Sequence, residues 1–290
     1  MSIELRNISY TYMKKTPFEK TALFDINLTI NEGEFIAIAG HTGSGKSTLI
    51  QIMAGLIKSE IGEVIVDGVN LNSKDKSAVR GARLKIGIVF QYPESQLFEE
   101  TVIKDIAFAP TNLNLDEAEI NQRVVEAMKL VGLSYDELKD VSPFNLSGGQ
   151  QRRVAIAGVL AMRPKYLILD EPTAGLDPQS HKAMMQNIKI LHDKHHMTII
   201  LVSHNMDDIA QFANRMIVLS QGRVIMDDTP RKIFNNSDIL KAAGLAAPSV
   251  TQFLTALKAN GLNITTQALT IDDCEKAIIE YLKILELPTD

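Results

Sequence analysis

The sequence has little cysteine, no long apolar run and no excess of basic residues. Cys274 is the single cysteine among 290 residues, which excludes an intramolecular disulfide framework and a thiolate-rich metal site and fits a reducing compartment. The most apolar stretches, residues 35–39, 166–169 and 197–202, are far shorter than the roughly 20 residues of a membrane-spanning helix. We therefore expect a soluble protein in the cytoplasm, whose work at a membrane would need a partner.

The charge and the N-terminus exclude two further classes. The formal net charge is −5, so a nucleic-acid backbone could be bound only through a local basic patch acting against the overall field. We expect no nucleic-acid partner. Residues 1–10 alternate apolar and polar side chains, which predicts a strand, and they lack the basic start and apolar run of a secretory signal.

Short apolar runs alternate with longer helical patterns, which is typical of an α/β fold with a largely parallel sheet covered by helices. The predicted strands are residues 35–39, 86–90, 166–170 and 198–203, and the predicted helices are residues 46–57, 178–194 and 205–213. A helical periodicity with an acidic first turn between residues 101 and 133 predicts an inserted helical lobe. Two helices that begin near Pro248 and Asp272 predict a small C-terminal lobe.

A glycine-rich segment between the first predicted strand and helix matches the phosphate-binding loop, and it consists of Gly40, His41, Thr42, Gly43, Ser44, Gly45, Lys46 and Ser47. Backbone N–H groups of such a turn point at one anion, and the following helix adds the positive end of its dipole. Lys46 is expected to contact the β- and γ-phosphates of ATP, Ser47 to bind Mg²⁺, and Thr48 to lie near the α-phosphate. The alternative is a glycine-rich turn that arose by chance.

The apolar strand 166–170 ends in two adjacent carboxylates, Asp170 and Glu171. Beside a phosphate loop, Asp170 is expected to join the Mg²⁺ ligands, and Glu171 to accept a proton from the attacking water. The alternative is that these two acids cap the helix that starts near Pro178.

The segment Leu146, Ser147, Gly148, Gly149 and Gln150 precedes another helical pattern. Ser147 can cap that helix, and the glycines expose backbone N–H groups, so the segment is a second anion-binding helix start. A single nucleotide needs only one such device. The segment therefore either caps its helix or binds a γ-phosphate that another subunit holds.

With these motifs the sequence resembles the ABC ATPase family over about residues 3–230, and residues 146–150 match the family's signature. The resemblance implies a P-loop NTPase cassette, with a RecA-like core sheet, an antiparallel β subdomain and an inserted helical subdomain at about 92–162. Residues 1–244 would form this ATPase domain, and residues 245–290 a mainly helical C-terminal lobe that serves dimerisation or assembly. It also implies that two subunits enclose two ATP molecules, each between the phosphate loop of one subunit and the signature of the other.

The resemblance assigns four further residues. Gln91 would sense Mg²⁺ and the γ-phosphate, Asp177 would be the acid of a loop at the dimer interface, His204 would contact the γ-phosphate, and Tyr12 would stack on adenine. Alternatives remain for three of them. Gln91 could be an ordinary loop residue, His204 a helix cap, and Tyr12 a core aromatic, with Phe18 available in the same loop.

Residues 90–102 and 105–108, together with the C-terminal lobe, resemble the second type of ATPase in energy-coupling factor transporters, which import vitamins or metal ions. This narrower resemblance implies a heterodimer with a paralogous ATPase, a transmembrane coupling protein that docks just after Gln91, and a membrane subunit that binds the substrate. The chain would then be peripheral on the cytoplasmic face of the cell membrane. Whether the pair is two copies or two different subunits, and which substrate is carried, stay open.

Other function classes share part of this pattern. An ATPase of another ABC importer would carry the same motifs. A non-transport ABC ATPase of DNA repair or translation would need a coiled-coil insert or two cassettes, which the sequence lacks. A nucleotide-switched interaction module would use the C-terminal lobe to bind another protein. A P-loop kinase would have no use for residues 146–150.

Overall fold

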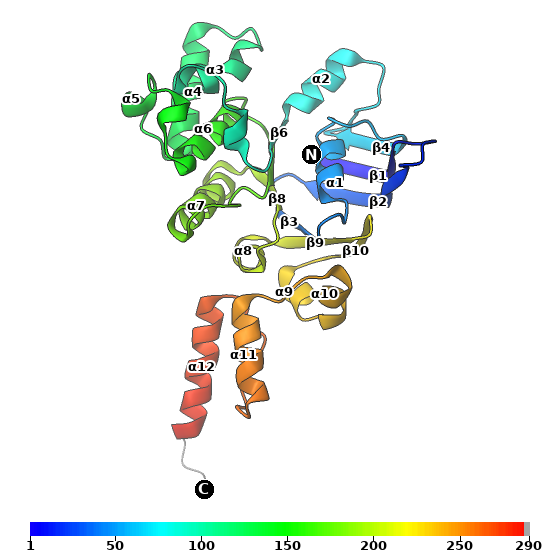
Figure 1. The fold of residues 1–290 in the computed structure, drawn as a ribbon, viewed down its shortest axis with the longest axis vertical. Coiled ribbons are helices and arrows are strands. Elements are labelled where there is room, and N and C mark those ends of the chain that lie inside the picture. Colours follow the sequence, from blue (N-terminus) through cyan, green and yellow to red (C-terminus); the bar gives the residue numbers. More distant parts are fainter. Residues whose placement is uncertain (287–290) are drawn as a thin grey trace. The chain divides into compact units, whose positions relative to one another are not determined.

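The structure is a computed structural model that describes residues 1–286, except for the side chains of residues 237 and 284–286. The chain folds into two compact units (Figure 1). Unit 1 consists of Met1–Phe35 and Ser47–Val202, and unit 2 consists of Ile36–Lys46 and the chain from Ser203 onward. The predicted division at residue 244 stays a prediction. Within the described part of the chain, no helix has the length and apolarity that crossing a membrane requires.

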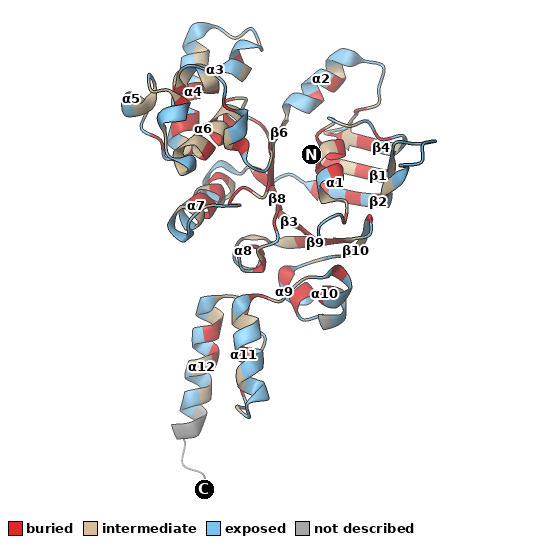
Figure 2. Cartoon of the chain, in the orientation of Figure 1, coloured by how far each residue is buried: buried red, intermediate tan, exposed pale blue. Residues whose placement is uncertain are grey.

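Unit 1 contains an antiparallel sheet. Its strands are β1 (Ser2–Tyr12), β2 (Lys20–Asn31), β4 (Ile61–Val66) and β5 (Val69–Asn70), in the order β2-β1-β4-β5. Ile3, Leu5 and Ile8 of β1 are buried, and residues between them are more exposed (Figure 2). This alternation gives the sheet one apolar face. The predicted N-terminal strand and the antiparallel β subdomain are confirmed.

The predicted buried strands are also confirmed, each to within about one residue. In unit 1, β6 (Ile86–Val89), β7 (Tyr166–Asp170) and β8 (Thr198–Val202) pair in parallel. In unit 2, β3 (Phe35–Ala39), which belongs to this unit from Ile36 onward, pairs in parallel with β9 (Arg215–Ser220), and β10 (Arg223–Asp228) is antiparallel to β9. All residues of β3, β7 and β8 are buried, which explains their continuous apolar sequences.

The helices of unit 1 include the inserted helical lobe. The elements in chain order are α1 (Lys46–Met53), which begins at the last residue of a unit 2 segment, then α2 (Lys76–Leu84), η1 (Pro93–Gln96), α3 (Val102–Thr111), α4 (Glu117–Leu130), α5 (Tyr135–Leu138), η2 (Pro143–Asn145), α6 (Gly148–Leu160) and α7 (Pro178–His195). Helices α3, α4 and α6 contact one another, and Val102, Ile106, Val124, Met128 and Val154 on them are fully buried. Residues 101–133 therefore hold two helices, and Asp116 caps the second of them.

Helix α1 is shorter than predicted. It ends at Met53 instead of residue 57 because Gly55 adopts a left-handed conformation with φ of 69°. The N–H of Leu56 then bonds back to the carbonyl of Gln51 at 2.9 Å. This is the geometry in which glycine commonly ends a helix.

The helices of unit 2 are α8 (Met206–Phe212), α9 (Pro230–Phe234), α10 (Ser237–Ala243), α11 (Ser249–Ala259) and α12 (Ile271–Glu286). Helices α11 and α12 confirm the two helices predicted near Pro248 and Asp272, and they share a small apolar core that includes Leu254 and Cys274.

Two contacts fasten this hairpin to α8. The N–H and hydroxyl of Ser249 donate to the carboxylate of Asp207 at 2.7 and 2.6 Å. Leu269 is 6% exposed and lies in the same apolar cluster as Met206 and Ile209. The C-terminal hairpin is therefore joined to α8 by both a polar and an apolar contact.

A buried carboxylate joins the turn between β4 and β5 to the starts of β6 and β7 in unit 1. Asp67 lies in the turn between β4 and β5, and its side chain is 3% exposed. It accepts hydrogen bonds from Lys85 at 2.8 Å, from the Tyr166 hydroxyl at 2.7 Å and from Lys165 at 3.3 Å. Burial alone would raise the pKa of Asp67, but these hydrogen bonds outweigh it and lower the pKa to about 2. The carboxylate is therefore ionised in the folded protein at neutral pH.

We expect Asp67→Asn to lower the free energy of unfolding at pH 7 by about 1–2 kcal/mol. The pKa of Asp67 is lower in the folded than in the unfolded protein. Its contribution is thus complete above about pH 4 and is lost as the pH falls toward 2. Urea unfolding between pH 7 and pH 3 measures this effect, and the difference between wild type and variant should shrink with acidification. Asp136→Asn, at an exposed position on α5, is the control; a pH-independent difference for Asp67→Asn would contradict the prediction.

Candidate functional site

The glycine-rich loop joins β3 to α1, and its backbone requires glycine. A Cβ on Gly40 would lie 2.3 Å from the carbonyl oxygen of Leu219. Gly43 and Gly45 have φ of 81° and 106°, which favour glycine. The loop is anchored by the turn between β9 and β10, where the N–H of Gly222 donates to the Ser44 carbonyl at 2.9 Å. Sequence reasoning missed this support, because Gly222 lies far along the chain in an ordinary hairpin turn.

Two side chains of the loop are suited to a polyphosphate. The Lys46 ammonium donates to the carbonyl oxygens of Gly40 and His41 at 2.6 and 3.1 Å, so it lies against the loop itself. The Ser44 hydroxyl is fully buried, and among the described residues it has no hydrogen-bond partner. A fixed cation, a glycine-rich backbone and an unsatisfied hydroxyl together fit an anion with several oxygens.

Ser47, Thr48 and Tyr12 belong to unit 1. Ser47 is exposed and Thr48 is buried, and the Tyr12 hydroxyl lies 3.1 Å from the Thr48 hydroxyl. The Tyr12 ring packs edge-on against Tyr10, with ring centroids 4.8 Å apart. The structure thus brings Tyr12 to the first turn of α1. The Phe18 side chain is 77% exposed.

Asp170 and Glu171 stand where β7 ends. Asp170 is its last residue and is 9% exposed. Glu171 has a φ of 51°, which is unusual for a residue with a side chain and is often found at functional sites. Its N–H donates to the carbonyl of Val202 on β8 at 3.0 Å, so the backbone of Glu171 is held by the neighbouring strand.

The helix after these two acids is capped by Asp177. Its carboxylate accepts from the N–H groups of Gln179 and Ser180, both at 3.0 Å. Hydrogen bonds from Ser180, followed by that from the Gln179 N–H, lower the pKa of Asp177. The alternative that Asp170 and Glu171 cap the helix at Pro178 is therefore wrong. The interface role of Asp177 stays a prediction.

The segment 146–150 begins α6 with a complete capping box. The Ser147 hydroxyl accepts from the Gln150 N–H at 3.4 Å, and the Gln150 side chain accepts from the Ser147 N–H at 3.1 Å. Gly148 is exposed, and a Cβ there would meet no atom within 4 Å. Ser147 therefore does cap α6, and the start of the helix is also open enough for a second molecule to approach Gly148.

His204 and Gln91 each follow a strand. His204 is exposed and comes two residues after β8. The adjacent Asn205 caps α8, because its side-chain oxygen accepts from the N–H groups of Asp207 and Asp208 at 3.0 and 3.2 Å. The alternative that His204 is the cap is therefore wrong. Gln91 is exposed, two residues beyond the end of β6.

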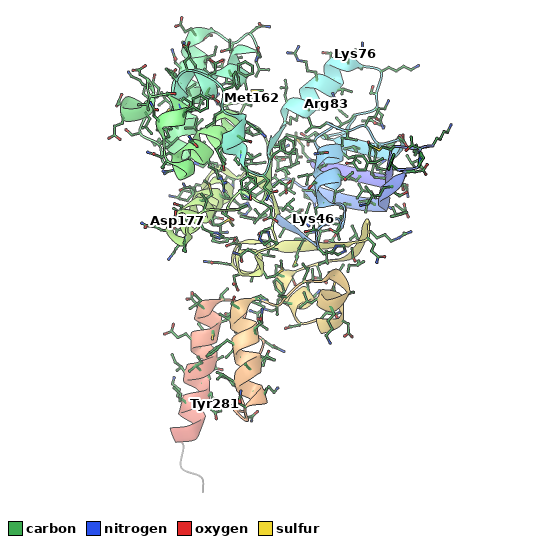
Figure 3. All side chains as sticks on the ribbon, in the orientation of Figure 1. Lys46, Lys76, Arg83, Met162, Asp177 and Tyr281 are labelled. Carbon is green, nitrogen blue, oxygen red and sulfur yellow. The ribbon has the colours of Figure 1, made fainter. Side chains whose placement is uncertain are left out.

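The predicted site residues are divided between the two units. Residues 40–46 and His204 lie in unit 2, whereas the others lie in unit 1. The structure brings Tyr12 to Thr48 and Ser147 to Gln150 by side-chain hydrogen bonds. The chain itself joins Lys46 to Ser47 at the start of α1 (Figure 3 labels Lys46). The individual roles of these residues stay predictions.

Comparison with known proteins identifies the family. The model of the ABC transporter family matches residues 23–174. Among solved structures, cbiO1 of Clostridium perfringens, described as part of the ABC transporter complex cbiONQ, aligns with a TM-score of 0.74 at 36% identity, over 89% of this chain and 97% of that one. A dimeric ATP-binding cassette in a post-hydrolysis state, bound to ADP and Pi, aligns with a TM-score of 0.69 at 34% identity, over 79% and 98%.

Two relatives are similar over almost their whole length. The energy-coupling factor transporter ATP-binding protein EcfA2 of Clostridium tetani is 53% identical over 280 residues, which is 97% of either chain. The protein of the same name from Clostridium perfringens is 50% identical over 283 residues, 98% of this chain and 99% of that one. The chain therefore belongs to the ABC transporter family and, within it, to the energy-coupling factor transporter ATP-binding proteins.

Proposed function

We propose that this chain binds ATP through residues 40–48 and hydrolyses it with Glu171 to drive import through an energy-coupling factor transporter. The observation that carries the proposal is the phosphate loop, where Lys46 lies against the loop carbonyls beside a buried, unsatisfied Ser44 hydroxyl. The relatives named for this transporter are about half identical over nearly the full chain.

The chemistry divides among residues with different properties. Lys46 would hold the β- and γ-phosphates, while Tyr12 would stack on the adenine ring. Glu171, fixed at a strained backbone position, would take a proton from the attacking water, and His204 would contact the γ-phosphate. Mg²⁺, held by Ser47, Asp170 and Gln91, would neutralise charge on the phosphates when bound.

A second ATPase subunit would complete the site. The open helix start at Ser147–Gln150 would bind the γ-phosphate held by the partner, and Asp177 would face the shared interface. Binding of ATP then draws the two subunits together, and loss of the γ-phosphate removes the contact that held them. The proposed pair is this chain with a paralogous ATPase. A structural relative that is dimeric with ADP and Pi supports the pairing.

A groove in unit 1 fits a helix from the transmembrane coupling protein. It has a volume of about 330 Å³ and lies among β6, the segment after η1, α3 and α6. Its apolar lining includes Phe98 and Phe108, which are 57% and 47% exposed and meet edge-on at 4.9 Å. Arg83 and Met162, which Figure 3 labels, also line it. Amphipathic helices bind apolar grooves of this kind. Docking here would place the chain on the cytoplasmic face of the membrane.

We expect Phe98→Ser to weaken assembly with the membrane partner by about 10-fold or more, because an exposed aromatic is a typical anchor of such a contact. ATP binding by the separate subunit should stay within about twofold of wild type. Co-purification from membranes and calorimetry with ATP measure the two quantities. Val125→Ser changes an apolar side chain on α4 that is 41% exposed and outside the groove, so it is the control. Full co-purification of Phe98→Ser would refute docking in this groove.

The function as a whole is tested by reconstitution. The chain is purified from membranes with its bound proteins, the proteins are identified, and the complex is placed in lipid vesicles. We expect the vesicles to take up one vitamin or metal ion, and only when ATP is supplied to the ATPase. Hydrolysis without any associated membrane protein would instead favour a non-transport ATPase.

A further inference from the structure

A buried arginine on a helix of unit 1 binds two other segments of the same unit. Arg152 lies on α6 and is 2% exposed. Its Nε and Nη2 donate to the two carboxylate oxygens of Glu94 at 2.9 and 2.7 Å. Its Nη1 donates to the carbonyl oxygens of Pro172 and Ala174 at 3.1 and 2.7 Å. The planar guanidinium thus uses its fork in two directions at once, which lysine could not do.

Arg152 and its partners belong to the three segments that carry the proposed chemistry. Glu94 lies in η1, three residues after Gln91. Pro172 and Ala174 follow Glu171 directly, in the turn where the Ala174 N–H donates to the Glu171 carbonyl at 3.1 Å. Arg152 itself lies two residues beyond the signature segment that begins α6.

A second contact brings the same two loops together. The ring of Tyr92, the residue after Gln91, lies 5.9 Å from the Arg152 guanidinium. A Cβ on Gly175 would lie 3.7 Å from the same ring. The loop after Gln91 and the loop after Glu171 are therefore in contact through Arg152 and Tyr92.

The charges of Arg152 and Glu94 fix the orientation of this contact. Burial alone would raise the pKa of Glu94, but the hydrogen bonds from Arg152 outweigh it and lower that pKa. Glu94 is therefore ionised, and an ionised bidentate pair is held in one orientation more strictly than a neutral hydrogen bond. Gln96, at the other end of η1, lines the docking groove. A displacement of η1 would thus move the Arg152 side chain, and with it the carbonyl groups of Pro172 and Ala174 to which that side chain donates.

We propose that Arg152 is a positioning residue. It makes the position of the loop after Glu171 depend on the position of η1, whose Gln96 lines the docking groove. The inference rests on the proposed function, which assigns Glu171 as the base and the groove as the docking site of a membrane partner. Arg152 acts through the backbone of residues 172–174 and does not itself touch the nucleotide. Through the same contact, binding of a partner in the groove would change the position of the loop that follows Glu171.

The test uses the assembled transporter with Arg152→Gln, Arg152→Lys, Glu94→Gln and the double variant Arg152→Gln with Glu94→Gln. We expect kcat for ATP hydrolysis to fall roughly 10- to 100-fold for each, because small misplacement of a catalytic group has effects of this size. The KM for ATP should stay within about twofold. Arg152→Lys should not rescue kcat, and the double variant should resemble the more impaired single variant.

The control is Arg163→Gln. Arg163 is 44% exposed and pairs with Glu126 of α4 at 2.7 Å. The substitution therefore removes an arginine–glutamate pair that contacts no loop of the site. Its kcat should stay within about twofold of wild type.

Three results overturn the inference. They are a kcat of Arg152→Gln within about twofold of wild type, a loss of activity in proportion to the fraction of unfolded protein in thermal melts, and a rise in KM equal to the fall in kcat. Glu94→Gln keeps the junction testable if an Arg152 variant does not fold. A wild-type complex without ATP hydrolysis would overturn the proposed function as well, whereas an active wild type with an equally active Arg152→Gln overturns only the inference.

Discussion

Replacing Glu171 by glutamine is expected to leave ATP binding intact and to lower the hydrolysis rate by about 10²- to 10⁴-fold, the usual contribution of a general base. Glutamine keeps the shape of the side chain and one acceptor oxygen, but its amide accepts no proton at neutral pH. The γ-phosphate would then stay in place, and with it the contact that joins two subunits. The variant should therefore accumulate as a closed pair with ATP.

Phosphate release measures the rate, and size-exclusion chromatography of the variant mixed with the paralogous ATPase, with and without ATP, measures the closed pair. Glu137→Gln, at an exposed position on α5, controls for loss of a surface carboxylate. Hydrolysis by Glu171→Gln at the wild-type rate would exclude Glu171 as the base. A slow variant that does not pair with the paralogous ATPase in the presence of ATP would instead contradict the sharing of nucleotide between subunits.

The replacement of Lys46 by alanine is expected to weaken ATP binding by about 10- to 100-fold. The Lys46 ammonium is the cation of the phosphate loop, and it donates to Gly40 and His41 of the same loop. A hydrogen bond to a charged group contributes about 1.5–3 kcal/mol, which corresponds to this range of affinities. The loss should appear for ATP and for ADP, because the lysine is proposed to contact the β-phosphate.

Calorimetric titration with ATP measures the affinity of the Lys46→Ala variant. Lys76→Ala, at an exposed position on α2 (Figure 3), makes the same substitution and removes the same charge outside the phosphate loop, so it is the matched control. Unchanged ATP affinity of Lys46→Ala would show that the glycine-rich loop is not the phosphate site.

Local patterns in the sequence predicted the elements whose causes are local. The buried strands were recognised because nearly all their residues are apolar, and the helix after Ser147 because serine is a common N-cap and a helical pattern follows it. The end of α1 was misjudged because the glycine at residue 55, and not the apolar pattern, ends it. The two rejected capping roles failed for a similar reason, since Asp177 and Asn205 stand closer to the helix starts.

Contacts that join distant parts of the chain were out of reach. Arg152 and Glu94 are 58 residues apart, and no spacing rule predicts that they form a buried pair. The support of Ser44 by Gly222 likewise depends on where the turn between β9 and β10 lies in the fold. The sequence pattern thus indicated which residues carry the chemistry, while the residues that hold them in place became visible only in three dimensions.

The attachment of the C-terminal hairpin to α8 affects how that hairpin can be studied. A chain cut after Gly244 would lack Leu269 and Ser249, leaving an apolar gap beside Met206 and Ile209 and depriving the Asp207 carboxylate of its partner. Lost ATPase activity in such a truncated protein would then report damage to the helix that follows His204, and not the absence of an assembly surface. Point substitutions at outward-facing apolar positions of α12, such as Ile279 and Leu282, which are 42% and 51% exposed, would separate the two effects.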